Sequence, residues 1–180
     1  KNTVREARHY PLLAFLADKP KGKVLEIGCG SGANLWAIAR EGFAAYGQDK
    51  SPTAIGLCKE LLQLNMVQAN LLVGDFHKLP YADDFFDIVV DIRSIQHTDA
   101  KKQVFEEVHR VLRSCGHFFS YHLSDGSSTE EIFEGQGIIT LGEKEARELL
   151  SGFEVSTEHY SRIYTDGRVA NYLAIMAKKL

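Results

Sequence analysis

Short β-type runs alternate along the chain with segments whose apolar residues recur at helical spacing. This alternation predicts an α/β domain built on a largely parallel sheet. The predicted strands are 23–27, 44–48, 70–73, 86–92, 117–121, 155–164 and 172–178. The predicted helices are 2–17, 34–41, 52–64, 100–112 and 143–150, with Pro11 interrupting the first half of the first one.

Local signals support several of these boundaries. Ser51-Pro52 combines an N-cap residue with the proline that helices favour at their first position. Gly42 is placed to end the helix before it. Asp166-Gly167 separates the last two β-type runs, which is a strong hairpin signal. The chain is therefore expected to close with an antiparallel pair.

Composition places the chain among ordinary globular domains. Of its 180 residues, 44% are hydrophobic and 25% are charged, which predicts one domain over 1–180 with a sizeable core. Residues 1–18 are predicted to form an N-terminal helical cap. Residues 123–142 are richer in Gly, Ser and Glu and are predicted to form a loop or lid.

Charge and cysteine content limit the expected partners and cellular compartment of the protein. The net charge of −3 argues against an electrostatic nucleic-acid binder. No apolar run approaches the roughly 20 residues of a membrane span, and the chain shows no signal peptide. Cys29, Cys58 and Cys115 are an odd number without a C-x-x-C pair. We therefore expect a cytoplasmic protein without a disulfide framework, and we find no metal-ligand spacing.

The sharpest chemical feature is the glycine-rich loop at 28–32, between a predicted strand and a predicted helix. Glycines there allow a tight turn and a close approach of ligand to backbone. The spacing Gly28-x-Gly30-x-x-Ala33 also satisfies a loose dinucleotide fingerprint, and Asp49 follows where either kind of ligand needs an acid for ribose hydroxyls. The glycines alone therefore leave the ligand open.

Charge separates the two ligands. A dinucleotide carries a pyrophosphate, which nearby carboxylates repel. Acidic residues stand at the ends of the first four predicted strands, at Glu26, Asp49, Asp75 and Asp91. Such an acidic rim suits a phosphate-free ligand with positive groups, and S-adenosylmethionine fits that description.

Five segments in order resemble the class I S-adenosylmethionine-dependent methyltransferases, well over 23–112 and by layout elsewhere. They are VLEIGCGSG at 24–32, YGQDKSP at 46–52, GDFHKLPY at 74–81, FFDIVV at 85–90 and VLRSCG at 111–116. The resemblance implies a Rossmann-like fold with a seven-stranded, mostly parallel sheet in the order 3-2-1-4-5-7-6. It also implies helices on both faces and a C-terminal antiparallel hairpin.

The resemblance assigns roles around the methionine half of the cofactor. Glu26 would lie near the ammonium group, directly or through water. The loop Gly28, Cys29 and Gly30 would present its backbone, with Cys29 as a packing residue. Asp91 and Ile92, at the end of the fourth strand, would lie close to the methyl-bearing sulfur.

The adenosine half is assigned in the same way. Asp49 would accept both ribose hydroxyls, and the stem of Lys50 would flank the adenine, where the family often has an apolar residue. Asp75 would accept from the adenine amino group, with Phe76 beside the ring. Arg93 stands where small or polar residues are common in the family, which indicates either an anionic group on the substrate or a surface pair.

Two histidines are candidates for the transfer step. A methyl acceptor can require a general base with a pKa near 7, for which histidine is suited. His97 follows the fourth strand and His122 follows the fifth, so both are expected to project into the crevice at the sheet edge. They are the predicted catalytic or substrate-contact residues.

The sequence thus predicts a methyltransferase that converts S-adenosyl-L-methionine to S-adenosyl-L-homocysteine. The acceptor is expected to be a small molecule, because no Asn/Asp-Pro-Pro-Tyr/Phe segment ends the fourth strand and no basic, aromatic-interleaved patch is present. A protein or RNA acceptor remains open, as does the oligomeric state. Two alternatives stand beside this reading: a non-catalytic domain that binds the cofactor, and an NAD-dependent oxidoreductase.

Overall fold

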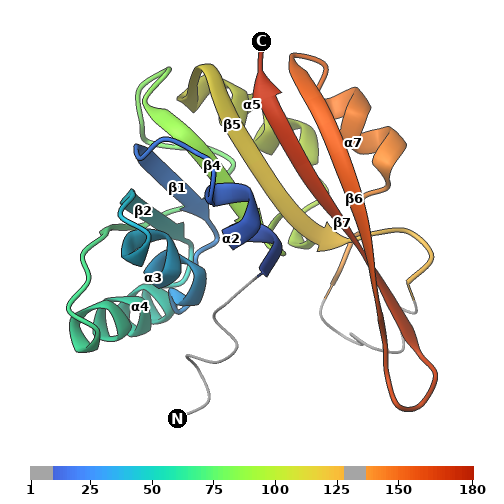
Figure 1. Cartoon of the computed structure of the whole chain (residues 1–180), viewed down its shortest axis with the longest axis horizontal. Coiled ribbons are helices and arrows are strands. Elements are labelled where there is room, and N and C mark those ends of the chain that lie inside the picture. Colours follow the sequence, from blue (N-terminus) through green and yellow to red (C-terminus); the bar gives the residue numbers. More distant parts are fainter. Residues whose placement is uncertain (1–9, 128–136) are drawn as a thin grey trace.

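A computed structural model describes residues 10–127 and 137–180 (Figure 1). The strands are β1 (Lys23–Ile27), β2 (Ala44–Asp49), β3 (Asn70–Val73), β4 (Phe86–Ile92), β5 (Leu112–Leu123), β6 (Phe153–Ile163) and β7 (Val169–Lys179). The helices are α2 (Tyr10–Leu16), α3 (Ala33–Arg40), α4 (Pro52–Leu64), the 3-10 turn η1 (Ile95–His97), α5 (Lys101–Val111) and α7 (Glu143–Leu149). None of the helices in these two ranges is both long and apolar enough to span a membrane.

The strands form one sheet in the order β3-β2-β1-β4-β5-β7-β6, which confirms the predicted topology. The pairs from β3 through β5 are parallel, whereas β7 runs antiparallel to both β5 and β6. The β6–β7 turn is the predicted hairpin: Gly167 takes a φ of +85°, and the Tyr164 N–H donates to the Arg168 carbonyl at 2.9 Å. Because β1 to β4 are parallel, their carboxyl ends meet along one edge of the sheet.

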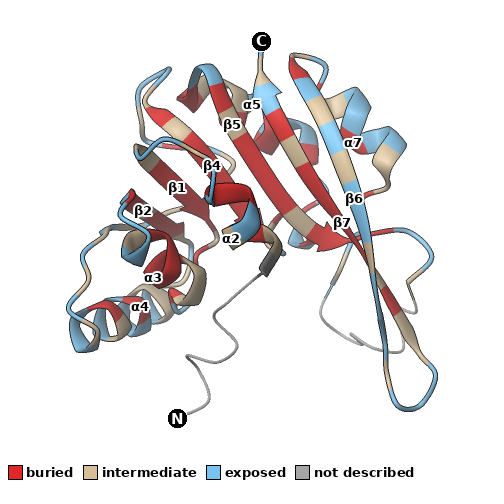
Figure 2. Cartoon of the chain, in the orientation of Figure 1, coloured by how far each residue is buried: buried red, intermediate tan, exposed pale blue. Residues whose placement is uncertain are grey.

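Apolar residues pack on both faces of the sheet. On one face, Leu25 and Val89 pack with α5 and α7. On the other face, Val24 and Val90 pack with α2, α3 and α4. The central strands β1, β4 and β5 are accordingly the most buried part of the sheet (Figure 2). The expectation of helices on both faces is confirmed.

The predicted caps are confirmed, whereas three strands begin earlier than predicted: β5 at Leu112, β6 at Phe153 and β7 at Val169. The Ser51 side chain accepts the Ala54 N–H at 3.2 Å, and Gly42 has a φ of +88°. β5 begins five residues earlier than predicted, since Leu112 pairs with Phe86 and residues 113–116 bulge out of the ladder. The turn η1 was not predicted. Residues 1–9 of the predicted cap and 128–136 of the predicted lid lie outside the described residues.

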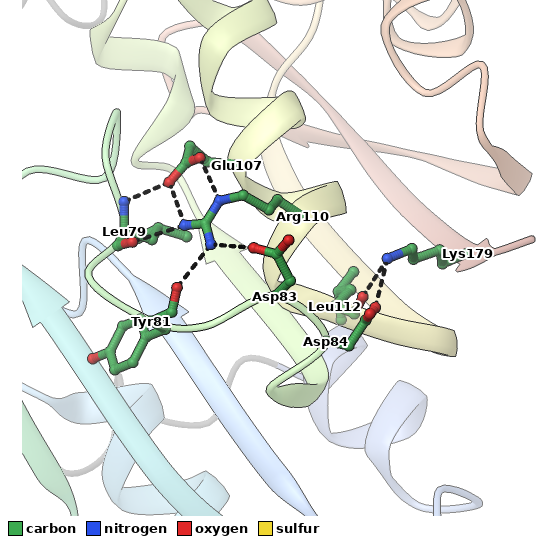
Figure 3. Close-up of polar contacts among 8 residues, drawn as sticks. All are labelled: Leu79, Tyr81, Asp83, Asp84, Glu107, Arg110, Leu112 and Lys179. Atoms are coloured by element: carbon green, nitrogen blue, oxygen red, sulfur yellow. Dashed lines mark hydrogen bonds and ion pairs between the residues drawn. The ribbon is translucent and has the colours of Figure 1, made fainter.

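Arg110 of α5 holds the loop between β3 and β4 (Figure 3). Its guanidinium donates to the carbonyls of Leu79 at 2.8 Å and Tyr81 at 2.7 Å. It also pairs with Asp83 at 2.9 Å and with Glu107 at 2.8 Å, and the Glu107 carboxylate accepts the Leu79 N–H. The Arg110 side chain therefore supplies hydrogen-bond donors to backbone carbonyls of this loop, which has no regular structure to satisfy them.

We expect Arg110→Ala to lower the free energy of unfolding by about 2 kcal/mol, because several charge-assisted bonds to a half-buried loop are lost together. Urea unfolding measures this change. Lys102→Ala is the matched control, since it removes an exposed pair on the same helix, Lys102–Glu106 at 3.8 Å, and should cost less than about 0.5 kcal/mol. Equal losses of unfolding free energy in the two variants would contradict the stabilising role of Arg110 at this loop.

Candidate functional site

The glycine loop joins β1 to α3 at the carboxyl edge of the sheet. Gly28 and Gly32 take φ values of +66° and +87°, which side chains disfavour. A Cβ on Gly28 would lie 2.1 Å from Ser94 Oγ, so this glycine is required by packing against the β4 end. A Cβ on Gly30 would meet nothing within 4 Å. Gly30 thus has open space beside its Cα, and its N–H is engaged by Asp49.

Asp49 ends β2 and ties the loop to it. One carboxylate oxygen accepts the Gly30 N–H at 2.9 Å, and the other accepts the Ser51 N–H at 2.9 Å. A carboxylate has about four acceptor positions, so two remain for other donors. These backbone bonds fix the orientation of the carboxylate.

Glu26 lies beneath the loop and is 1% exposed. Its Oε1 accepts from the Asn34 amide at 3.0 Å, whereas its Oε2 is buried with no hydrogen-bond partner. Burial raises the pKa of this carboxyl to about 8, and the Asn34 hydrogen bond opposes the shift. An unpaired buried acceptor is costly, so this oxygen is suited to receive a cationic donor.

A pocket of about 520 Å³ opens beside the loop, a size usual for small-ligand sites. It brings together six of the predicted site residues: Gly28, Asp49, Lys50, Asp75, Phe76 and His97. Three further lining residues were not predicted: His77, Ser94 and Gly137. The sequence signal for His77 was its place two residues after a strand-end acid. Ser94 and Gly137 carried no such signal.

Asp75 follows β3 and is joined to its neighbours. Its carboxylate accepts the His77 N–H at 2.9 Å and contacts the His77 ring, and these contacts hold the pKa of Asp75 below its usual value. The other nitrogen of the His77 ring bonds Thr98 Oγ1 at 2.8 Å. The Asp75 carbonyl accepts from the Gln48 amide at 2.9 Å. The acid therefore has a fixed place on the pocket wall, although its side chain is 59% exposed.

Asp91 and Ile92 do not line this pocket. Asp91 is 0% exposed, and its carboxylate accepts the N–H groups of Ser94 and Ile95 and the Ser120 hydroxyl at 2.8, 3.1 and 2.7 Å. Its side chain thus holds the turn η1 from inside. The expected place of Asp91 and Ile92 close to the methyl-bearing sulfur stays a prediction. Ile92, next along the strand, points to the opposite face and lines a neighbouring pocket.

His122 is also placed away from the pocket, which corrects the expectation that it projects into the crevice. It is 0% exposed, with Nδ1 at 2.9 Å from Ser120 Oγ and Nε2 at 3.3 Å from the Leu141 carbonyl. Burial lowers its pKa to about 4, so the ring is neutral near pH 7. His97 is exposed and lines the pocket as expected.

Cys29 is a packing residue of the loop, as the sequence indicated. It is 6% exposed, and a Cβ on Gly47 would lie 2.9 Å from its sulfur. A hydrogen bond with Cys58 and burial raise the pKa of the Cys29 thiol. A thiol in this state is a poor nucleophile.

The described end of the predicted lid approaches the site. Gly137 lines the pocket, and the Ile139 N–H donates to the Gln96 carbonyl at 2.8 Å. The Leu141 N–H donates to the Leu123 carbonyl at 3.3 Å. These backbone bonds attach residues 139–141 to η1 and to the end of β5, and Gly137, just before them, lines the pocket.

The pocket fits S-adenosylmethionine better than a dinucleotide. Asp49 and Asp75 offer acceptors to ribose hydroxyls and an adenine amino group, and Glu26 holds an unsatisfied acceptor behind the loop. Lys50 is the one lysine or arginine among the residues that line the pocket. A pyrophosphate would therefore face two carboxylates with little compensating charge.

The fold and the site define a Rossmann-like α/β domain with its ligand site at the carboxyl ends of β1 to β3. A family model described as "Methyltransferase domain" matches residues 25–120, which is more than half of the chain. The chain belongs to this family, as the resemblance implied, and its cofactor is S-adenosylmethionine. The family match therefore favours the methyltransferase hypothesis over the NAD-dependent oxidoreductase.

Individual relatives agree with this assignment. The chain is 31% identical over 158 residues, 82% of its length, to a Mycobacterium ulcerans protein named probable phthiotriol/phenolphthiotriol dimycocerosates methyltransferase 2, of which it covers 59%. It is 32% identical over 119 residues, 64% of its length, to the sterol 24-C-methyltransferase of Schizosaccharomyces pombe, of which it covers 32%. The chain thus spans between a third and three fifths of these curated relatives.

A solved structure supports the fold. The crystal structure of a SAM-dependent methyltransferase from Methanosarcina mazei superposes with a TM-score of 0.78 at 21% identity. The match covers 95% of this chain and 98% of that one. At this identity the likeness concerns the fold alone.

Proposed function

We propose that this protein transfers the methyl group of S-adenosylmethionine to a small-molecule acceptor. The observation that carries the proposal is the convergence of Asp49 and Asp75, from neighbouring strands, on one pocket that Gly28 of the glycine loop also lines. The names of the relatives, a sterol methyltransferase and a methyltransferase of phthiotriol dimycocerosates, favour a small organic acceptor over a macromolecule. We also propose a single domain over 1–180 and a cytoplasmic location. The three free cysteines support the cytoplasmic location.

In this proposal the chain's own residues hold and orient the ligand. Asp49 accepts from the ribose with a carboxylate that Gly30 and Ser51 keep in place. Asp75 and Phe76 bind the base, and the stem of Lys50 covers its other side. Glu26 receives the ammonium group from beneath the loop. The bound cofactor supplies a methyl group activated by its sulfonium, so positioning is the main task left to the protein.

His97 is the residue that we propose to touch the acceptor or to take its proton. It is the last residue of η1 and lines the pocket with an exposed side chain. His122 is removed from this role because both of its ring nitrogens are engaged in the core. Since one predicted base is thereby lost, a cofactor-binding domain without turnover stays as the second candidate function.

Ligand-dependent stabilisation tests the proposal. At a hundred times its Kd, S-adenosylhomocysteine should add about 2.7 kcal/mol to the free energy of unfolding and raise Tm by roughly 5–10 °C, whereas NAD⁺ should change neither. Differential scanning fluorimetry measures both. A shift with NAD⁺ alone would overturn the proposed function. Binding followed by no release of S-adenosylhomocysteine with any acceptor of a sterol, lipid and aromatic panel would favour the second candidate.

A further inference from the structure

A second pocket of about 530 Å³ lies against the first and has a different chemical character. Ser31 lines it from the glycine loop, and Arg93 lines it from the β4 end. Gly28 of the same loop and Ser94, the next residue after Arg93, line the cofactor pocket. Neighbouring residues of the loop and of the β4 end therefore line the two pockets. With the cofactor placed as proposed, a molecule in the second pocket would lie next to its methionine half.

Three tyrosines line this second pocket from β5, β6 and β7. Tyr121 of β5 and Tyr172 of β7 are stacked, with ring centroids 5.0 Å apart and planes 13° apart. Tyr160 of β6 lies 5.9 Å from Tyr121 in a tilted arrangement. Aromatic walls of this kind favour flat rings, which gain offset-stacked or edge contacts.

Two arginines supply the charge of the second pocket. Arg93 takes a φ of +63°, a conformation that a non-glycine residue rarely keeps, and its N–H donates to the Tyr121 carbonyl at 2.8 Å. Arg162 of β6 lies with its guanidinium carbon 4.9 Å from the centre of the Tyr164 ring. Within residues 10–127 and 137–180, neither guanidinium has a carboxylate within 4.0 Å.

No residue that lines the second pocket is acidic, in contrast to the cofactor pocket with Asp49 and Asp75. Burial raises the pKa of Tyr121 to about 12, so this phenol adds no negative charge near pH 7. The remaining lining residues are small, aliphatic or neutral polar ones. The second pocket is thus positively charged at two points and aromatic along one side.

We propose that this second pocket binds the methyl acceptor, and that the acceptor carries an anionic group on a flat, ring-containing body. The planar guanidinium forks of Arg93 and Arg162 suit a carboxylate, and the tyrosines suit the ring. The proposal rests on the proposed function for the placement of the cofactor next door. The proposal makes Arg93 a substrate contact rather than half of a surface pair. His97 lines the cofactor pocket and not this one, so its proposed role is confined to the acceptor group that reaches the methyl of the cofactor.

The test uses the full chain saturated with S-adenosylhomocysteine and isothermal titration with two probes. The probes are 3-(4-hydroxyphenyl)propanoate and its neutral amide. We expect the carboxylate to bind at least tenfold more tightly than the amide. Arg162→Gln should reduce this preference to less than twofold, as should Arg93→Gly, in which glycine keeps the positive φ without strain. Arg168→Gln, on the same hairpin but outside the pocket, is the matched control and should keep the preference.

Equal affinities of the two probes, or no binding of either, would overturn the inference. So would weaker binding of S-adenosylhomocysteine itself in the arginine variants, because the guanidinium groups would then serve the cofactor. Failure of the proposed function is a separate result, visible when S-adenosylhomocysteine does not bind the unchanged protein. In that case the probes are titrated alone: a carboxylate preference that Arg162→Gln removes supports the pocket, and its absence overturns it.

Discussion

Replacing Asp49 with alanine is expected to weaken the binding of S-adenosylhomocysteine at least a hundredfold. In the proposed function the substitution removes two charge-assisted contacts to ribose hydroxyls, each worth roughly 1.5–3 kcal/mol. It also frees the Gly30 N–H, which the carboxylate holds at 2.9 Å, so the glycine loop loses its tether to β2. Isothermal titration of the purified variant measures the affinity.

Two further variants separate ligand contact from loop geometry. Asp75→Ala removes an acid that lines the same pocket but whose carboxylate bonds His77 rather than the glycine loop, and we expect a loss of about tenfold from one missing contact. Asp166→Ala, in the β6–β7 turn and far from the pocket, should leave the affinity unchanged. If Asp49→Ala bound the ligand within twofold of the unchanged protein, the ribose would be held elsewhere.

Replacing Glu26 with glutamine is expected to change how stability depends on pH. Burial raises the pKa of Glu26 from 4.5 to about 8 in the folded protein. A carboxyl whose folded pKa is raised stabilises the fold while it is protonated, and this stability is lost as pH rises from the unfolded value toward the folded one. The difference in unfolding free energy, unchanged protein minus variant, should therefore fall by about 3 kcal/mol between pH 5 and pH 8 and level off above it.

Urea unfolding at several pH values without ligand measures this difference. Asp91, whose pKa burial raises to about 6, titrates in both proteins and cancels in the comparison. Glu60→Gln, on the exposed face of α4, is the control and should give a difference that does not change with pH. A flat difference for Glu26→Gln as well would show that the Glu26 carboxyl is not the group that burial perturbs.

The same substitution should weaken S-adenosylhomocysteine binding about tenfold, because an amide cannot pair with an ammonium group as a carboxylate does. Glu26 would thus destabilise the ligand-free domain and contribute to binding. This combination is common at functional sites, where a buried group is kept for its chemistry at a cost in stability. Unchanged affinity would place the ammonium group away from Glu26.

Much of the site could be predicted from the sequence because its parts are local. The glycine loop follows a strand, and Asp49 and Asp75 come where strands end, so parallel topology is enough to bring them to one edge. The N-cap at Ser51 and the turn at Gly167 depend only on neighbouring residues. The sheet order came from the resemblance of five ordered segments, and the structure confirms it.

The direction of side chains could not be predicted in this way. Asp91 and Ile92 are neighbours at a strand end, yet one turns into the core and the other into the second pocket. His122 is buried because the Leu141 carbonyl, from a segment beyond the next loop, meets its ring. The bulge at 113–116 depends on how β5 pairs with β4.

The sequence by itself determined the seven strands and most of the helices, which edge of the sheet carries the acids and which family the chain resembles. Local geometry and the alternation of faces are written in consecutive residues, so they need no distant partner. Only the tertiary structure decided which histidine is exposed, how Arg110 holds its loop, and that Arg93, Arg162 and three tyrosines gather in one pocket. These outcomes depend on contacts between segments far apart in the chain, and the free energy of such contacts is set by packing rather than by spacing.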